Sequence, residues 1–521
     1  MRAQPPSTRS AGDEAASAGP AAGPAGNSGS LVAAGSGAAA TTAAAADSFA
    51  AKPVAVGGGS GASGPRIAEP AAAGSESAAS GSLTAGQVTA DSASPPPPTP
   101  RRRGGLFWHR DFRRLWIGET VSQFGTQVSI LAMPLVAVVT LKSGAGVVGV
   151  LVAMEFAAFL LVGLPAGAWV DRWRRRPVMI AADVVRFALL ASVPVAAWAG
   201  VLTIWQLYAV ALFQGVATVF FDVAYQSYLP SLLGSGELVE GNSKLQGSAS
   251  VAQTAGPGFA GYLVQALTAP TAVAVNALGF LASAVGIGAI RKAEPTPERP
   301  EHPRLRAEIV EGLRVVLRHP ILRVLAAATA AANFLTAVFA AVIVVFLVHD
   351  VGVTPGSIGL LLSAGSVGGL VGALTTSAMI RRIGHARTVW LPLLVGCPLG
   401  MVLPLTHRGW SLALFVVGWF GFSFAITVYN IAAVSLRQQL CERSLLGRMN
   451  ATMRFLSWGV MPFGALLGGF LGDALGSRDT LWLTQVGYLV VPLLLLMSPM
   501  RGRLPERDEE SPTLAAAASR V

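Results

Sequence analysis

Several carboxylates of this sequence lie inside long apolar stretches, where a charge is costly and therefore informative. Glu155 falls near the middle of the apolar run 145–169, and Glu119 lies in the run 114–140. Burial in an apolar medium disfavours the charged form of a carboxyl group, which is a property that proton binding and release require. Both residues are therefore candidates for proton coupling. The alternative for each is a hydrogen bond to a neighbouring helix with no further role.

A second set of charges gathers where three apolar runs end or begin. The segment 163–177 places one carboxylate and four arginines between two runs, and Asp183 and Arg186 follow at a spacing that allows pairing on one helix. We predict a charge cluster that holds one of two conformations through its ion pairs. Static pairing is the alternative. The predicted cluster comprises Asp171, Arg172, Arg175, Arg176, Asp183, Arg186 and Asp222.

Uncharged polar residues in the same runs are weaker candidates for lining a cavity. Gln123 and Gln127 share a helical face with Glu119, and the other candidates are Asn333, Tyr429 and Asn430. Single polar residues in membrane helices often only bridge two helices. Arg454 is expected to extend toward the membrane surface. The alternative is that it points inward, where it could attract an anionic substrate.

Glycine and proline recur at spacings that favour close helix packing. Gly163 and Gly167 lie one helical turn apart, and Pro257 removes a backbone donor and bends its helix. The predicted packing residues are Gly163, Gly167, Gly256, Pro257, Gly261, Gly464 and Gly468.

The elements that must position these residues are membrane-spanning helices. The chain has 521 residues, of which 52% are hydrophobic and 12% charged, whereas a soluble domain carries about 25% charged residues. We predict an all-α integral membrane protein with twelve transmembrane helices. They lie near 114–140, 145–169, 177–199, 203–230, 244–266, 270–290, 322–348, 356–380, 387–405, 410–436, 452–474 and 480–499. The fifth run is the least hydropathic.

The polar segments divide the chain into five parts. Residues 1–105 form an Ala/Gly/Ser/Pro-rich tail that we expect to be disordered, as we do residues 501–521. Residues 106–290 and 321–500 are each expected to form a six-helix bundle. Between them, 291–320 contains an amphipathic helix expected to lie on the inner membrane surface.

Lysine and arginine concentrate in alternate loops and at both ends of the chain. This distribution predicts a multi-pass protein of the cell membrane with both termini in the cytoplasm. We also expect a monomer.

An internal repeat relates the two predicted bundles. Phe221-Asp222-Val223-Ala224 corresponds to Tyr429-Asn430-Ile431-Ala432, and Gly261 corresponds to Gly468, with an offset of about 207 residues. Two pseudo-symmetric bundles with a substrate site at their interface are a known plan for transporters.

Three of these segments resemble the major facilitator superfamily, in particular its drug:proton antiporter and siderophore exporter branch. They are the G-x-x-x-D-R-x-x-R-R segment around Asp171, the Gly256-Pro257 segment, which has only Gly261 where the family has adjacent glycines, and the segment 311–320. The resemblance implies a secondary active transporter that exports a small amphipathic molecule, such as a drug-like compound or secondary metabolite. Proton antiport and alternating access would drive this export.

Other functions remain open on the sequence alone. The same fold could serve an importer or a lipid flippase, and a membrane sensor or scaffold would not transport at all. We expect a small-molecule substrate, protons and the bilayer as partners, and no nucleic acid. No enzyme, cofactor or metal site is expected, because the sequence lacks a P-loop and its histidines are scattered.

Overall fold

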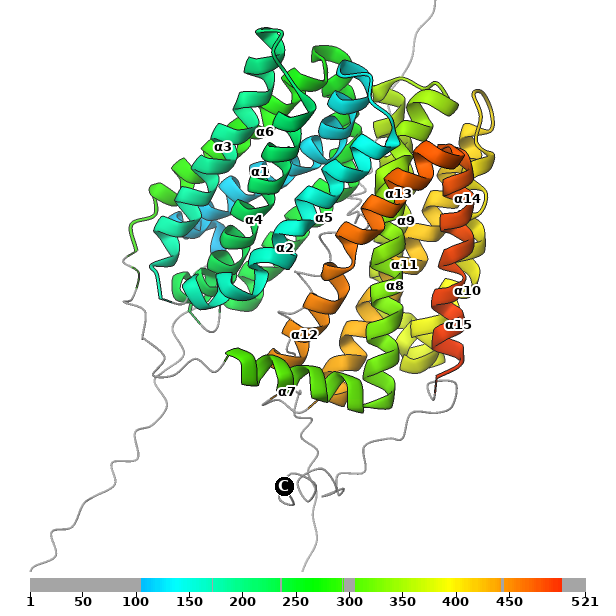
Figure 1. The fold of residues 1–521 in the computed structure, drawn as a ribbon. Coiled ribbons are helices and arrows are strands. Elements are labelled where there is room, and N and C mark those ends of the chain that lie inside the picture. The colour runs from blue at the N-terminus through cyan, green and yellow to red at the C-terminus, as the bar shows by residue number, and fades with distance from the viewer. Residues whose placement is uncertain are drawn as a thin grey trace, which may run out of the picture. The chain divides into compact units, whose positions relative to one another are not determined.

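The computed structural model describes residues 105–170, 172–234, 237–292, 294, 305–441 and 445–498. All regular structure in these ranges is helical (Figure 1). The first group of helices is α1 (Arg110–Leu135), α2 (Ala145–Val170), α3 (Arg175–Trp198), α4 (Ile204–Leu232), α5 (Leu238–Leu267) and α6 (Ala269–Gly288). The predicted tails, apart from Gly105, and Asp171 lie outside the described residues.

A single helix, α7 (Leu305–Arg318), precedes the second group. This group contains α8 (Pro320–Val345), α9 (Pro355–Ile383), α10 (His385–Gly400), α11 (Leu412–Leu440), α12 (Leu446–Gly459), α13 (Met461–Leu475), α14 (Ser477–Tyr488) and α15 (Val490–Leu496). The shorter helical segments are η2 (Leu106–Trp108), η3 (Val136–Thr140), η4 (Phe346–Asp350) and η5 (Leu403–Leu405).

Eleven helices of the described residues are long and apolar enough to cross a membrane, whereas the sequence predicted twelve. In this count α12 and α13 form one span, and so do α14 and α15. The helix that falls short is α5, although it has 30 residues. Gln246, Gln253 and its glycines lower its hydropathy.

A histidine side chain caps the N-terminus of the first long helix in each group. His109 accepts a hydrogen bond at Nδ1 from the backbone N–H of Phe112 at the start of α1. At the start of α8, His319 Nδ1 accepts from the N–H groups of Ile321 and Leu322. Each ring therefore satisfies N–H groups that a helix terminus leaves unpaired.

The helices pack in two groups that meet along two pairs of helices. Within the first group α1 packs on α5 and α6, and α3 and α2 pack on α4. Within the second, α8 packs on α13, and α11 on α9 and α10. The main contacts between groups are α2 with α13 and α5 with α9 (Figure 1).

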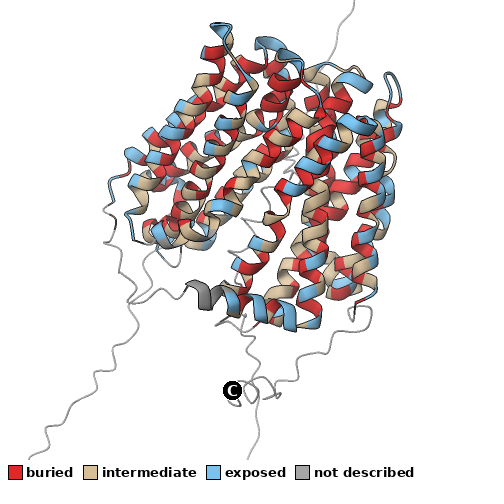
Figure 2. Ribbon diagram, viewed as in Figure 1, coloured by how far each residue is buried: buried red, intermediate tan, exposed pale blue. Residues whose placement is uncertain are grey.

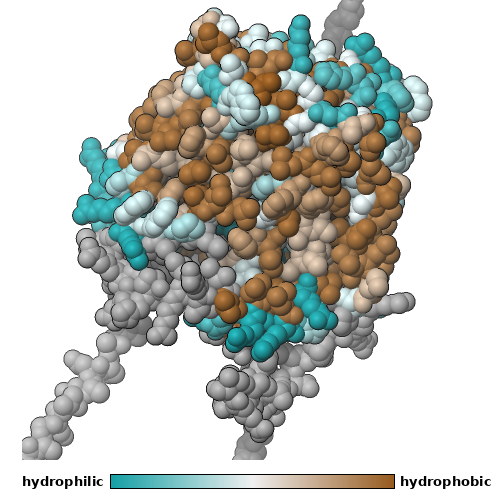
Figure 3. Space-filling model, viewed as in Figure 1, coloured by the Kyte–Doolittle hydropathy of each residue, from teal (hydrophilic) through white to brown (hydrophobic). Residues whose placement is uncertain are grey.

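Burial follows these contacts, and apolar side chains cover the sides of the helices. Buried residues concentrate along the faces that helices turn toward one another (Figure 2). Large apolar residues nevertheless remain exposed, including Trp205 and Leu161. The visible face is apolar along the helices and hydrophilic near their ends (Figure 3). Such a surface suits a lipid solvent.

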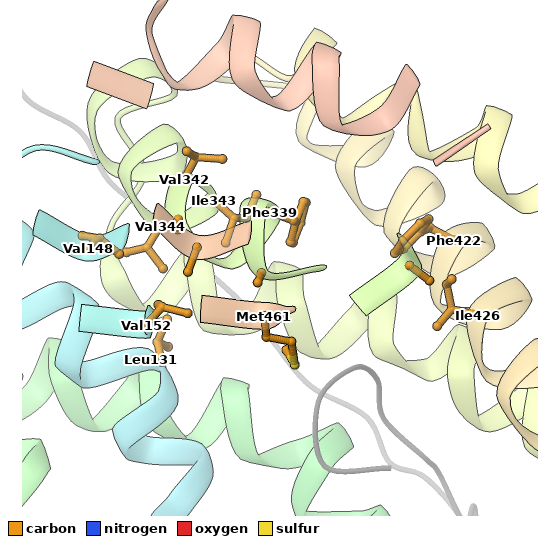
Figure 4. Close-up of a cluster of buried hydrophobic side chains, with 14 of the residues drawn as sticks. Leu131, Val148, Val152, Phe339, Val342, Ile343, Val344, Phe422, Ile426 and Met461 are labelled. Carbon is orange, nitrogen blue, oxygen red and sulfur yellow. The ribbon is translucent and has the colours of Figure 1, made fainter. Parts of the chain in front are cut away.

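One apolar cluster joins the two groups. Leu131 of α1 and Val148 and Val152 of α2 lie near Val344 of α8 and Met461 of α13 (Figure 4). These side chains are buried, so this part of the interface between the groups is dry.

Candidate functional site

A buried ion pair lies within the first group of helices. Asp183 and Arg186, both on α3, are 0% and 4% exposed and form a salt bridge at the i, i+3 spacing. The Arg186 guanidinium also lies over two aromatic rings, 4.2 Å from the centroid of Phe221 and 4.3 Å from that of Phe280. The apolar surroundings require the charge of Arg186 to be paired.

Two further carboxylates from other helices face this pair. Glu119 of α1 accepts a hydrogen bond from Gln123 at 2.7 Å and interacts electrostatically with Arg186, Asp183 and Asp222. Asp222 of α4 interacts electrostatically with Arg186. We call Glu119, Asp183, Arg186 and Asp222 the acidic cluster. Asp222 also interacts electrostatically with Arg454, which lies outside the cluster. The three carboxylates of the cluster therefore outnumber the two cations near them, so proton binding relieves repulsion among them.

The arginines of segment 172–176 make different contacts. The backbone N–H groups of Arg175 and Arg176 donate to the Glu294 carboxylate at 2.6 and 3.1 Å. The Arg176 side chain donates to the carbonyl oxygens of Ile287 and Gly288 at the end of α6, where a cation is favoured. Among the described residues no ion pair joins these arginines to the acidic cluster. The residues predicted as one cluster therefore divide into two sets.

Exposed Arg172 lies beside a groove between α3 and α4. This groove has a volume of about 770 Å³, and its lining is mostly apolar. Arg172 is therefore placed on the outer side of these two helices rather than beside Asp183.

A cavity of about 340 Å³ lies between α2 and α4 of the first group and α12 of the second. Its lining includes Phe159, Gly163, Val223, Arg454 and Trp458. The Arg454 guanidinium lies 5.5 Å from the Phe159 ring centroid and 5.4 Å from that of Trp458. The prediction that Arg454 extends to the surface is wrong, because these two rings hold its side chain against the cavity.

Glu155 lies on the same face of α2, one turn before Phe159. The residue is exposed, and the residues that the structure describes form no hydrogen bond or ion pair with its carboxylate. The two proton-coupling candidates are therefore in different settings. Glu119 belongs to the acidic cluster, and Glu155 stands apart from it.

The predicted polar cavity candidates mostly bridge helices. Asn333 of α8 donates to the Ser457 carbonyl oxygen of α12 at 3.0 Å. The buried Tyr429 hydroxyl lies 2.7 Å from Thr329 Oγ1. Gln127 is buried beside Gly256, which places α1 against α5. Asn430 is half-buried on α11, and Gln123 contacts Glu119.

The close packing predicted at Gly163 and Gly167 is not found. Among the residues that the structure describes, a Cβ atom at either glycine would meet nothing within 4 Å. The reason is that the helices of the two groups diverge here, and Gly163 itself lines the cavity.

Three of the remaining predicted glycines, Gly261, Gly464 and Gly468, lie against backbone, whereas Gly256 lies against the Gln127 side chain. Gly261 of α5 faces Gly359 of α9, where a Cβ atom would lie 2.8 Å from the Gly359 Cα. Pro257 places its carbonyl oxygen against the same Gly359. On α13, Gly464 faces Phe334 and Gly468 faces Val338 of α8. Backbones can approach this closely only where side chains are absent.

The same close approach joins α2 to α13. A Cβ atom at Gly149 would lie 2.7 Å from the Gly469 Cα. We call this contact the α2–α13 seam and its counterpart at Gly261 and Gly359 the α5–α9 seam. Because each seam leaves no room for side chains, the two groups are closed together there.

A hydrogen bond to a helix start completes each seam. The Gly146 N–H donates to Asp473 Oδ1 at 3.0 Å, and the Gly356 N–H donates to Gln265 Oε1 at 3.0 Å. The sequence reasoning missed Asp473 and Gln265. The repeat could have found them, because the offset of 208 residues that relates Phe221 to Tyr429 also relates Gln265 to Asp473.

Known proteins resemble the chain over this whole helical region. A family model described as a transmembrane secretion effector matches residues 106–517. The multidrug efflux pump Tap of Mycolicibacterium fortuitum is 28% identical over 394 residues, covering 74% of this chain and 94% of that protein. The macrolide efflux protein A of Streptococcus pyogenes is 22% identical over 408 residues, covering 77% and 98%.

Solved structures share the fold at low sequence identity. A mutant of the nucleoside transporter NupG matches with a TM-score of 0.62 and 11% identity, covering 74% of this chain and 99% of that one. A bacterial homologue of the lysosomal transporter Spinster, inward-facing and occupied, matches with a TM-score of 0.61 and 14% identity, covering 75% and 96%. The chain therefore belongs to the transmembrane secretion effector family of the major facilitator superfamily, as a multi-pass membrane transporter of the drug-efflux type.

Proposed function

We propose that this transporter exports a small amphipathic molecule in exchange for protons by alternating access. The observation that carries the proposal is the acidic cluster, in which Glu119, Asp183 and Asp222 share Arg186 inside apolar helices. Excess carboxylate at such a depth is suited to taking up and releasing protons. The efflux proteins to which the chain is similar support the outward direction.

Alternating access is supported by the difference between the two ends of the interface. At the α2–α13 and α5–α9 seams the backbones touch, whereas the described part of the chain leaves open space around Gly163 and Gly167. The cavity lies on the latter side, next to α12, on which α7 packs. We propose that this is the cytoplasmic side, so that the structure represents an inward-facing state.

The membrane topology that we propose has twelve spans and cytoplasmic termini. α5 is the twelfth span, because its 30 residues pack against α1 and α9 despite low hydropathy. An even number of spans agrees with the lysine and arginine distribution. We further propose that one chain suffices for transport.

Reconstitution into proteoliposomes tests the proton coupling. A proton gradient would be imposed, and movement of fluorescent amphipathic drugs would be followed for the wild type and for Glu119→Gln, Asp183→Asn and Asp222→Asn. We expect at least one of these variants to lose gradient-driven movement by tenfold or more, since removing an essential proton site abolishes coupling (general acid–base effects span about 10²–10⁴-fold).

The matched control is Glu237→Gln, a change of the same type at an exposed position before α5. It should transport like the wild type. Full coupling in all three cluster variants would reject the acidic cluster as the proton site. Glu155→Gln would then test the remaining carboxylate.

A further inference from the structure

We propose that Arg454 is a substrate-anchoring residue, and that the cavity beside it selects amphipathic molecules with an anionic group next to an aromatic or other flat apolar part. The inference rests on the proposed function in one respect: the ligand of the cavity is taken to be the transported molecule.

The first support is the state of the Arg454 charge. No carboxylate of the described residues lies within the 4.0 Å ion-pairing distance of its guanidinium. Asp222 attracts it only over a longer distance. A guanidinium offers five N–H donors in a fixed plane, and a carboxylate, sulfonate or phosphate can accept two of them together.

The second support is the shape and chemistry of the surrounding wall. Phe159, Phe455 and Trp458 line the cavity beside Arg454. The Phe159 and Trp458 rings lie 4.4 Å apart between centroids and are tilted by 55°. Their arrangement gives an apolar surface on which a flat ring can stack, next to the cation.

The third support is that the cavity joins both groups of helices. Phe159 and Val223 come from α2 and α4, whereas Arg454 and Trp458 come from α12. A ligand that contacts both sides affects how the two groups move against each other, which transport by alternating access requires. Asn450 adds a polar side chain from α12 to the same wall.

Two other charged residues face this region and must be considered. Asp222 competes with an anionic ligand for Arg454, so ligand binding and this attraction oppose each other. Glu155 lies one turn from Phe159 and would favour a cation at its own position. The charge that the cavity prefers therefore depends on which of these residues the ligand reaches. Because Arg454 lies beside the aromatic wall, a ligand whose ring stacks on that wall reaches Arg454.

Binding of two matched probes tests the inference without any gradient. The purified full-length protein, in nanodiscs of neutral phosphatidylcholine, would be titrated with radiolabelled 2-naphthalenesulfonate and with 2-naphthylmethylammonium. The rings are the same and only the charge differs. We expect the sulfonate to bind the wild type about tenfold more tightly or better, as a desolvated charge-assisted contact provides.

Variants then assign the preference to Arg454. Arg454→Gln should abolish it by weakening the sulfonate alone, and Arg454→Lys should retain part of it. Trp458→Leu should weaken both probes and leave their ratio unchanged, and Glu155→Gln should not reduce sulfonate binding. The control Arg314→Gln removes the same charge at an exposed position of α7 and should bind like the wild type.

A salt titration of the wild type gives a second measurement that needs no variant. The sulfonate affinity should fall with ionic strength more steeply than that of the ammonium probe. Absent sulfonate binding, equal or tighter ammonium binding, or a preference that survives in Arg454→Gln would overturn the proposal. If the preference is found but no gradient drives transport, the binding site stands and the proposed function fails.

Discussion

His319 caps α8 through an acceptor nitrogen, so its cap depends on protonation. Nδ1 accepts hydrogen bonds from Ile321 and Leu322 only while it carries no proton. Burial lowers the pKa of His319 below its ordinary value of 6.5. The folded chain therefore favours the neutral ring, and the stabilisation is complete above pH 6.5 and is lost as the pH falls through the lowered pKa.

We predict that His319→Asn flattens this acid dependence. Asparagine caps a helix start without titrating, so the variant keeps at low pH about 1 kcal/mol that the wild type loses. Thermal unfolding of the purified protein between about pH 8 and pH 5 measures the difference. His349→Asn, at an exposed position, is the control. Parallel pH curves for wild type and His319→Asn would contradict the cap.

At the residue scale, side-chain contacts were predictable from the sequence where both residues lie on one helix. The i, i+3 spacing alone predicts the pairing of Asp183 with Arg186, which the structure contains. Contacts between distant helices were not predictable in this way. Arg454 lies against Phe159, nearly 300 residues earlier, and no local pattern indicates that contact.

At the scale of helices, a glycine-to-leucine substitution should act differently at the two ends of the interface between the groups. Gly149→Leu places a side chain where the Gly469 Cα and the Ala465 carbonyl oxygen lie within 3 Å, so it should force the α2–α13 seam apart. Gly163→Leu enters open space and should leave this seam intact.

Hydrogen exchange measures this difference directly. The Gly146 N–H is protected by Asp473, so Gly149→Leu should raise deuterium uptake at residues 145–149 several-fold. Gly163→Leu should show wild-type uptake there while reducing transport, because a bulky residue blocks closure of the cavity side. Equal uptake in both variants would show that Gly149 does not hold the seam.

Helix positions were largely predictable, whereas the seams were not. Apolar runs of about 20 residues identify membrane helices because the bilayer fixes their length. The seams instead depend on which glycine of one helix meets which glycine of another. Gly163 and Gly167 have the better known spacing, yet the close contacts are made by Gly149 with Gly469 and by Gly359 with Gly261.

For the whole molecule, α7 links the two groups and is itself fixed to the second. Glu311 forms an ion pair with Arg448 of α12 at 2.7 Å. Gly312 is buried against the Arg448 carbonyl oxygen and Thr452. The predicted amphipathic helix is therefore present, with one face on α12 and exposed apolar residues such as Val310 and Leu317 elsewhere.

We predict that Gly312→Leu detaches α7 from α12 and lowers stability by about 1–3 kcal/mol, the usual cost of overpacking. Deuterium uptake along α7 should rise, and the thermal midpoint should fall. Val310→Leu changes an exposed position of the same helix and should alter neither. Unchanged uptake in Gly312→Leu would mean that α12 does not hold the helix.

The low hydropathy of α5 has a consequence for how the protein is made. As the twelfth span that we propose, α5 buries Gln253 and four of its small residues, Gly256, Ala252, Ala260 and Gly261, against other helices instead of lipid. A helix of this composition partitions poorly into lipid on its own. Its insertion during synthesis must therefore await helices that can shield its polar side, α1 before it and α9 after it. The nascent chain would then acquire its final topology only after much of the second half has been translated.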